Sequence, residues 1–170
     1  DRKVTDSGAG GTALAIGHKT TYQTIGLDEK GNPHLSLLKH AKQMGKSTAV
    51  ICTSSITHAT PASFIANVKN REQQEDIAKQ YLEGYCDIAI GGGADYFKAD
   101  KRKDKLDLPN ELRKKGFDVV FSEKDLFESK SDRIVALLDD NHLQDAAKRG
   151  NVMEKSLRKT LDLMQKNENG

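Results

Sequence analysis

The sequence predicts an α/β fold, with a mostly parallel sheet sandwiched by helices. Four short apolar runs lack the polar alternation of a half-exposed strand, and segments with helical periodicity lie between them. Strands that are apolar on both sides are typical of parallel sheets covered on both faces. The length of 170 residues suits a single α/β domain over residues 1–170, or the N-terminal piece of a larger domain.

The expected strands and helices alternate along the chain. The strands are expected at 48–52, 87–90, 117–121 and 133–138. The helices are expected at 12–16, 35–44, 72–85, 109–115 and 153–166. In the last of these, Leu157, Leu161 and Met164 fall on one apolar stripe. Residues 26–33 are expected to form a turn or small hairpin, and the glycines 91–93 a tight turn rather than a phosphate loop.

Charge and cysteine content narrow the class of protein. The net charge is +2, and Lys and Arg are interspersed with Asp and Glu, so the chain has no basic stripe for a nucleic acid. No apolar run approaches the length of a membrane span. The basic run 101–103 is flanked by aspartates and is expected to be a solvated loop. Cys52 and Cys86 lie in or beside apolar runs, which favours buried free thiols over a disulfide.

The beginning of the chain suits nucleophilic or anion-binding chemistry. Asp6 and Ser7 lead into the small residues 8–11 and then into a helix. A serine at a helix N-terminus lies near unpaired N–H groups and the positive end of the helix dipole, which favours an alkoxide and a neighbouring phosphate. The same pattern is an ordinary helix start with Asp6 or Ser7 as the N-cap, and on its own it favours that simpler interpretation.

A second segment lies at the carboxyl end of an expected strand, where parallel sheets bind ligands. His58 and Thr60 follow the first strand, with Thr60 expected as the N-cap and Pro61 as the first residue of a helix that continues through 64–68. Their nitrogen and oxygen could join a metal's coordination, although a cap and a loop histidine are the simpler alternatives. Thirteen residues after His58, Arg71 could hold a phosphate with its planar fork of donors, or could be a surface charge.

Taken together, these segments resemble the alkaline phosphatases. The likeness runs in order along most of the chain and is weakest from about 99 to 151. It is carried by the segments 4–12, 17–20, 57–62, 67–71 and 87–93. The fold that the resemblance implies is an incomplete version of the alkaline phosphatase α/β domain.

The resemblance also implies an activity and a set of site residues. Phosphate monoesters would be hydrolysed through a phosphoserine at Ser7. A pair of zinc ions would activate its oxygen, stabilise the leaving group and activate the water that releases phosphate. Arg71 would clamp the nonbridging phosphate oxygens, and Asp6 would orient Arg71. Thr60 would bind magnesium, with His58 in an altered magnesium site. A homodimer and a periplasmic or extracellular location are implied as well.

The zinc ligands of that family are largely missing from this sequence. Four histidines match no zinc ligand and are expected to be solvent-facing or structural: His18, His34, His40 and His142. The sequence, which has no initiator Met, suits a clipped or excised piece of a longer chain. A serine without metal or base is a weak nucleophile at neutral pH, so we expect negligible phosphatase activity from this chain alone. The alternatives are a non-catalytic phosphate-binding or scaffold fragment and a related phosphoryl or sulfuryl transferase.

Overall fold

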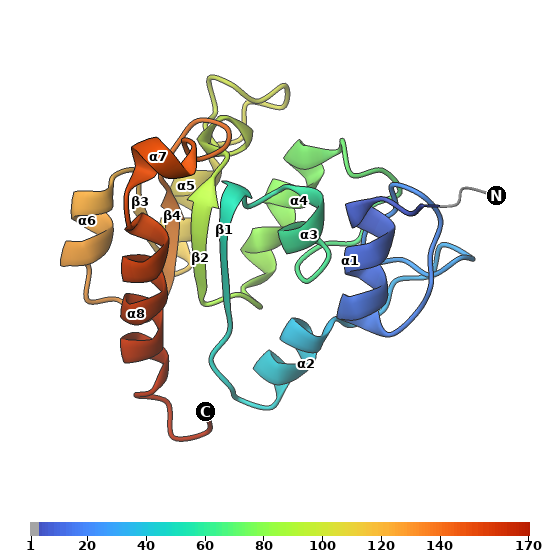
Figure 1. Cartoon of the computed structure of the whole chain (residues 1–170), viewed down its shortest axis with the longest axis horizontal. Coiled ribbons are helices and arrows are strands. Elements are labelled where there is room, and N and C mark those ends of the chain that lie inside the picture. The colour runs from blue at the N-terminus through green and yellow to red at the C-terminus, as the bar shows by residue number, and fades with distance from the viewer. Residues whose placement is uncertain (1–3) are drawn as a thin grey trace.

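A parallel four-stranded sheet forms the centre of the computed structural model, which describes residues 4–170 (Figure 1). The strands are β1 (Ala49–Ser55), β2 (Ile88–Gly92), β3 (Asp118–Val120) and β4 (Ile134–Leu137). Their order is β1-β2-β4-β3, and every neighbouring pair is parallel. The predicted α/β class and all four predicted strands are confirmed.

Helices cover both faces of this sheet and extend beyond β1 (Figure 1). The α-helices are α1 (Ser7–Ile16), α2 (Leu37–Gln43), α3 (Ala59–Ala62), α4 (Gln74–Gln80), α5 (Leu108–Lys114), α6 (Glu123–Glu128), α7 (Ala146–Arg149) and α8 (Val152–Met164). Two short 3₁₀ helices are η1 (Tyr81–Glu83) and η2 (Ala94–Tyr96). The helices predicted at 12–16, 35–44, 72–85, 109–115 and 153–166 are all present, some with shorter bounds.

Alternate strand residues enter two separate hydrophobic cores. Ala89 and Val135 pack on one face with residues of α4 and α5, whereas Ile90 and Ala136 pack on the other with residues of α6 and α8. Because successive strand side chains point to opposite faces, a strand between two cores needs apolar residues at every position. This explains the continuous apolar runs from which the strands were predicted.

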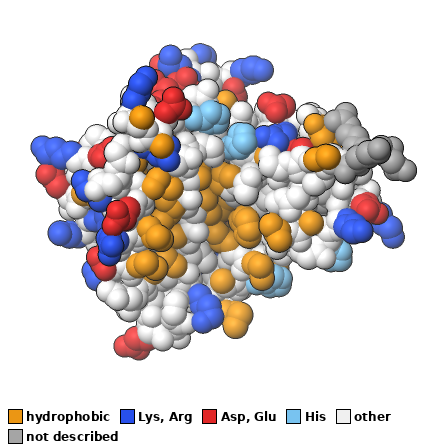
Figure 2. Space-filling model, viewed as in Figure 1, with side chains coloured by type: hydrophobic (Ala, Val, Ile, Leu, Met, Phe, Trp, Pro, Cys, Tyr) orange, Lys and Arg blue, Asp and Glu red, His pale blue; other side chains and the backbone are white. Residues whose placement is uncertain are grey.

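The apolar stripe predicted for α8 faces outward for most of its length. Leu157 and Leu161 are 51% and 56% exposed, while Ser156, Thr160 and Leu163 are buried. A helix turns 100° per residue, so packing of the Ser156 and Thr160 face carries the neighbouring leucines to the surface. Figure 2 shows hydrophobic side chains gathered across the middle of the molecular surface that is seen in Figure 1.

The basic run 101–103 was wrongly predicted to be solvated throughout. Arg102 is fully buried, although Lys101 and Lys103 are exposed. Its guanidinium donates two hydrogen bonds to the carboxylate of Asp104, at 2.6 and 2.8 Å, and further bonds to two backbone carbonyl oxygens. Its charge and donors are therefore satisfied inside the protein, which is the condition for burying an arginine.

The segment after β1 also differs from its prediction. The helix α3 has only four residues, with His58 rather than Thr60 at the N-cap position, and Pro61 lies inside it. Val68 is not helical but forms an isolated antiparallel bridge with Ile25. Val68 exchanges both backbone hydrogen bonds with Ile25, at 2.9 and 3.0 Å, which is an extended and not a helical pairing.

The other expectations for the connecting segments are confirmed in part. Leu27 and Pro33 form an antiparallel bridge that closes the predicted turn over 26–33. The glycines 91–93 do not form a tight turn, because Gly91 and Gly92 are the last two residues of β2 and Gly93 alone of the three has a positive φ, +101°. A Cβ added to Gly92 would be 2.0 Å from the carbonyl oxygen of Asn141, in the loop after β4. Cys52 and Cys86 are free thiols. Over residues 4–170, no helix is long and apolar enough to cross a membrane.

Candidate active site

Asp6, not Ser7, caps the helix that begins the site. The Asp6 carboxylate accepts hydrogen bonds from the N–H groups of Gly8 and Ala9, at 3.0 and 3.1 Å. Ser7 is the first residue of α1 and is exposed. Because Asp6 satisfies these N–H groups, the Ser7 hydroxyl is left available for other contacts.

The small residues after Ser7 allow close packing around it. A Cβ added to Gly8 would lie 2.9 Å from Asp6 Oδ2, and one added to Gly11 would lie 2.8 Å from Ser63 Oγ, just after α3. The glycines therefore let the capping carboxylate and the α3 segment approach the start of α1. This packing brings the segment that carries His58 beside the helix that carries Ser7.

Arg71 contacts Ser7 across 64 residues of sequence. Its Nη1 donates to Ser7 Oγ at 2.7 Å and to Asp6 Oδ2 at 3.2 Å. Its Nη2 lies 2.9 Å from His58 Nε2. A guanidinium can only donate, so His58 Nε2 is the acceptor and the ring proton sits on Nδ1. The structure thus brings together four of the residues singled out from the sequence.

The Asp6 carboxylate is the negative charge beside the Arg71 guanidinium. Burial alone would raise the pKa of the Asp6 carboxyl, but hydrogen bonds from the N–H groups of Gln23, Ala9 and Gly8 and from the Arg71 guanidinium outweigh it and lower the pKa. Asp6 is therefore ionised at neutral pH and offsets the positive charge of Arg71. A carboxylate that accepts several N–H bonds is the usual origin of such a lowered pKa.

His58 is held as a neutral acceptor beside Arg71. Burial, followed by the charge of Arg71 and the neighbouring His142, lowers the pKa of the His58 imidazole. The loop that carries it is fixed by Gln74, whose Oε1 accepts hydrogen bonds from Ser55 Oγ at 3.2 Å and Thr57 Oγ1 at 2.9 Å. Protonation of His58 would place a second positive charge against the guanidinium, which explains the direction of the shift.

His142 lies beside His58, although it was predicted to be only solvent-facing or structural. Its ring lies edge-on to His58 with the centroids 5.4 Å apart, and its Nδ1 accepts a hydrogen bond from the Ser55 N–H at 2.9 Å. The signal that could have found it is position, because it follows β4 at the carboxyl end of the sheet.

The remaining histidines take structural or surface positions, as predicted. The rings of His18 and His34 stack with centroids 4.2 Å apart, and His34 Nε2 lies 3.0 Å from Asp28 Oδ2. His40 is exposed on α2. These three side chains have no contact with Ser7 or Arg71 among the hydrogen bonds of residues 4–170.

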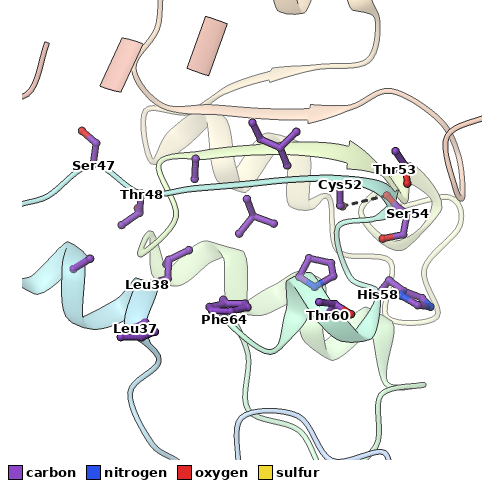
Figure 3. Close-up of a pocket in the computed structure, with 15 residues that line it drawn as sticks. Leu37, Leu38, Ser47, Thr48, Cys52, Thr53, Ser54, His58, Thr60 and Phe64 are labelled. Atoms are coloured by element: carbon purple, nitrogen blue, oxygen red, sulfur yellow. Dashed lines mark hydrogen bonds between the residues drawn. The ribbon is translucent and has the colours of Figure 1, made fainter. Parts of the chain in front are cut away.

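Thr60 lies on α3, within one turn of His58. Both line one end of a groove of about 600 Å³ that follows β1, with Leu37, Leu38 and Phe64 on its helical wall (Figure 3). A metal would need further ligands, because residues 4–170 contain no group of three or more His, Cys, Asp or Glu side chains that could hold an ion. The described residues therefore do not fit a zinc pair, and His58 and Thr60 would supply only part of a magnesium shell.

Comparison with known proteins gives a consistent family. A sequence model of the family described as alkaline phosphatase matches residues 1–170. Alkaline phosphatase 4 of Bacillus subtilis is 38% identical over 155 residues, which are 88% of this chain and 33% of the relative. Alkaline phosphatase of Schizosaccharomyces pombe is 35% identical over 154 residues, which are 82% of this chain and 29% of that protein. The chain thus spans about a third of these relatives.

Solved structures show the same relation. Thermus thermophilus alkaline phosphatase matches with a TM-score of 0.91 at 30% identity, over 98% of this chain and 37% of that one. Alkaline phosphatase of the Antarctic bacterium TAB5 matches with a TM-score of 0.86 at 32% identity, over 96% of this chain and 49% of that one. A TAB5 variant with one histidine replaced by aspartate, which has magnesium bound, matches with a TM-score of 0.90 at 32% identity, over 98% and 48%.

Proposed function

Because the chain belongs to the alkaline phosphatase family, we propose that Ser7 accepts the phosphoryl group of a phosphate monoester and that Arg71 binds this group. The observation that carries the proposal is the 2.7 Å contact between Ser7 Oγ and Arg71 Nη1. The Arg71 guanidinium reaches the exposed Ser7 hydroxyl although the two residues are 64 positions apart in the sequence. A guanidinium in this place can hold a phosphate beside the serine oxygen that would accept the phosphoryl group. Residues 1–170 would then be one unit of a larger catalytic domain, since the relatives are longer.

The chemistry at Ser7 is a displacement at phosphorus. Ser7 Oγ forms a bond to phosphorus while the bond to the ester oxygen breaks, and water later cleaves the serine phosphoester. The Arg71 donors that now contact Ser7 and His58 would turn to the nonbridging phosphate oxygens. Asp6 would keep the guanidinium in place through its own contact with Nη1, and His58 would remain neutral beside it.

Ionisation of the Ser7 hydroxyl is the step for which residues 4–170 supply no group. Among the hydrogen bonds of residues 4–170, the Ser7 hydroxyl contacts only the Arg71 donor, so no general base accepts its proton. In the family, zinc would supply that ionisation, and the described residues do not form the ligand set. We therefore propose that this chain binds phosphate but hydrolyses monoesters at a negligible rate. The second candidate is a non-catalytic fragment in which Ser7 only binds phosphate and never accepts the phosphoryl group, and the 2.7 Å contact of Ser7 with Arg71 is equally compatible with it.

For a full-length alkaline phosphatase that contains this chain, we also propose bound metals, a subunit assembly and a location. The magnesium bound in the TAB5 variant supports a magnesium side to which His58 and Thr60 contribute here. A zinc pair on the Ser7 side, a homodimer and a location outside the cytoplasm follow from the family resemblance. Phosphate monoesters are the proposed substrates.

Phosphate titration and turnover test the two parts of the proposal separately. Arg71→Ala should weaken binding of inorganic phosphate in calorimetry by at least about tenfold, the equivalent of about 1.4 kcal/mol. Arg158→Ala, at a residue 75% exposed on α8, is the matched control and should bind like the unchanged protein. Equal phosphate affinity in both variants would refute the clamp. Robust p-nitrophenyl phosphate turnover with added zinc and magnesium, lost in Ser7→Ala, would refute the missing-ligand argument but support the nucleophile.

A further inference from the structure

A turn with a strained backbone contacts both Asp6 and Arg71. Residues 21–24 form a turn in which the Thr24 N–H donates to the Thr21 carbonyl at 3.2 Å. Gln23 has a φ of +66°, and over residues 4–170 only Lys105 is another non-glycine residue with positive φ. This left-handed conformation is unfavourable for residues with a side chain, and persists only where surrounding contacts enforce it.

The backbone of Gln23 contacts both charged members of the site. Its N–H donates to Asp6 Oδ1 at 3.1 Å, and its carbonyl oxygen accepts from the Arg71 N–H at 2.8 Å. Two residues further on, Ile25 exchanges backbone hydrogen bonds with Val68. Backbone hydrogen bonds therefore connect the segment 23–25 to the segment 68–71, and the last of these bonds is at Arg71.

We propose that Gln23 is a positioning residue for the phosphate site, acting through its left-handed backbone. A single peptide unit on each side of Gln23 fixes the Asp6 carboxylate and the start of the Arg71 side chain relative to each other. The guanidinium then reaches Ser7 Oγ, Asp6 and His58 in one fixed arrangement. This inference rests on the proposed function, since it assigns a role in binding phosphate at that site.

The role belongs to the backbone rather than to the amide side chain. Within residues 4–170, the hydrogen bonds of Gln23 involve its N–H and carbonyl oxygen. Glycine and asparagine adopt positive φ readily, alanine less so, and β-branched residues hardly at all. Phosphate affinity should therefore follow the order Gly, Asn and Gln, then Ala, then Val at this position.

The test combines phosphate binding with NMR signals of the Arg71 guanidinium. Gln23→Val should weaken phosphate binding on the order of tenfold and average the guanidinium signals by rotation, while Gln23→Gly should leave both unchanged. Lys105→Val places the same residue at the other strained position and is the matched control, with affinity expected within about twofold of the unchanged protein. In an Arg71→Ala background, Gln23→Val should have no further effect on phosphate binding.

Two results would overturn the proposal. One is unchanged phosphate affinity and unchanged Arg71 signals in Gln23→Val. The other is an equal loss in Lys105→Val, which would mean that general destabilisation is responsible. If Gln23→Val does not fold, phosphate affinity and the Arg71 signals are compared between the milder Gln23→Ala and the unchanged protein instead. If the unchanged protein binds no phosphate, the proposed function fails, whereas loss of the ordered Arg71 signals in Gln23→Val alone would still support positioning.

Discussion

Replacing Asp6 by alanine should destabilise the protein far more than loss of an ordinary helix cap. Three kinds of contact disappear together, namely the α1 cap, the bond from the Gln23 N–H and the pair with Arg71. The cap contributes about 1 kcal/mol. The bond from Gln23 contributes about 1 kcal/mol and the charged bond from Arg71 about 2 kcal/mol. The expected loss is therefore about 4 kcal/mol, a large part of the total stability of a typical domain.

Urea unfolding followed by circular dichroism measures this loss, with Asp107→Ala as the control. The Asp107 side chain also caps a helix, but it accepts only from the Asn110 N–H at 3.1 Å, and it is exposed. Its replacement should cost about 1 kcal/mol. Asp6→Asn keeps a good capping residue without the charge and should fall between the two. If Asp6→Ala and Asp107→Ala cost the same, then the contacts of Asp6 with Gln23 and Arg71 contribute nothing, and the reasoning is refuted.

Three further predictions concern stability. Arg102→Ala removes the buried guanidinium from Asp104 and two carbonyls and should cost about 3 kcal/mol in urea unfolding, while Lys101→Ala beside it should change the free energy by less than about 0.5 kcal/mol. Within α1, the Cβ added by Gly10→Ala would lie 3.7 Å from Thr5 Cγ2, so this variant should stabilise the protein by up to about 1 kcal/mol. The Cβ added by Gly11→Ala would lie 2.8 Å from Ser63 Oγ, so that variant should destabilise it. Equal melting temperatures of the two variants would contradict this packing. The pKa of Asp6 is lowered by its N–H contacts and that of Asp140 chiefly by its hydrogen bond from Lys98, so the folded state is favoured above the ordinary aspartate pKa of 3.8 and loses stability as the pH falls below it. Unfolding free energies that stay level down to pH values below the ordinary pKa would argue against these carboxylate contacts.

The strands could be predicted because their signal is local. A strand buried on both faces is a continuous apolar run, and all four runs became strands of one parallel sheet. The orientation of α8 could not be predicted in the same way. Ser156 and Thr160 pack inward while Leu157 and Leu161 remain exposed, and this choice depends on how the helix sits on the sheet rather than on its own sequence.

Residues that make their contacts through side chains were easier to find in the sequence than residues that make them through the backbone. Ser7, Asp6, His58 and Arg71 are recognisable as residue types in a family pattern, so the sequence alone singled them out. The burial of Arg102 was missed because two of its four hydrogen bonds go to the backbone carbonyls of Glu75 and Tyr96, and such contacts leave no trace in residue types. Gln23 was missed for the same reason, since only its N–H and carbonyl oxygen reach the site.

In the proposed function, phosphate binding and serine ionisation depend on different groups. Asp6, Gln23 and Arg71 form a connected set of hydrogen bonds within residues 4–170, which is the proposed phosphate clamp. Ser7 receives a hydrogen bond from that clamp but gives its proton to no base among residues 4–170. A donor next to a serine oxygen stabilises a charge that forms there, but it does not remove the proton. Because the two tasks use different groups, phosphate affinity should persist in this chain where turnover does not, and measuring both on one preparation decides whether they are separable.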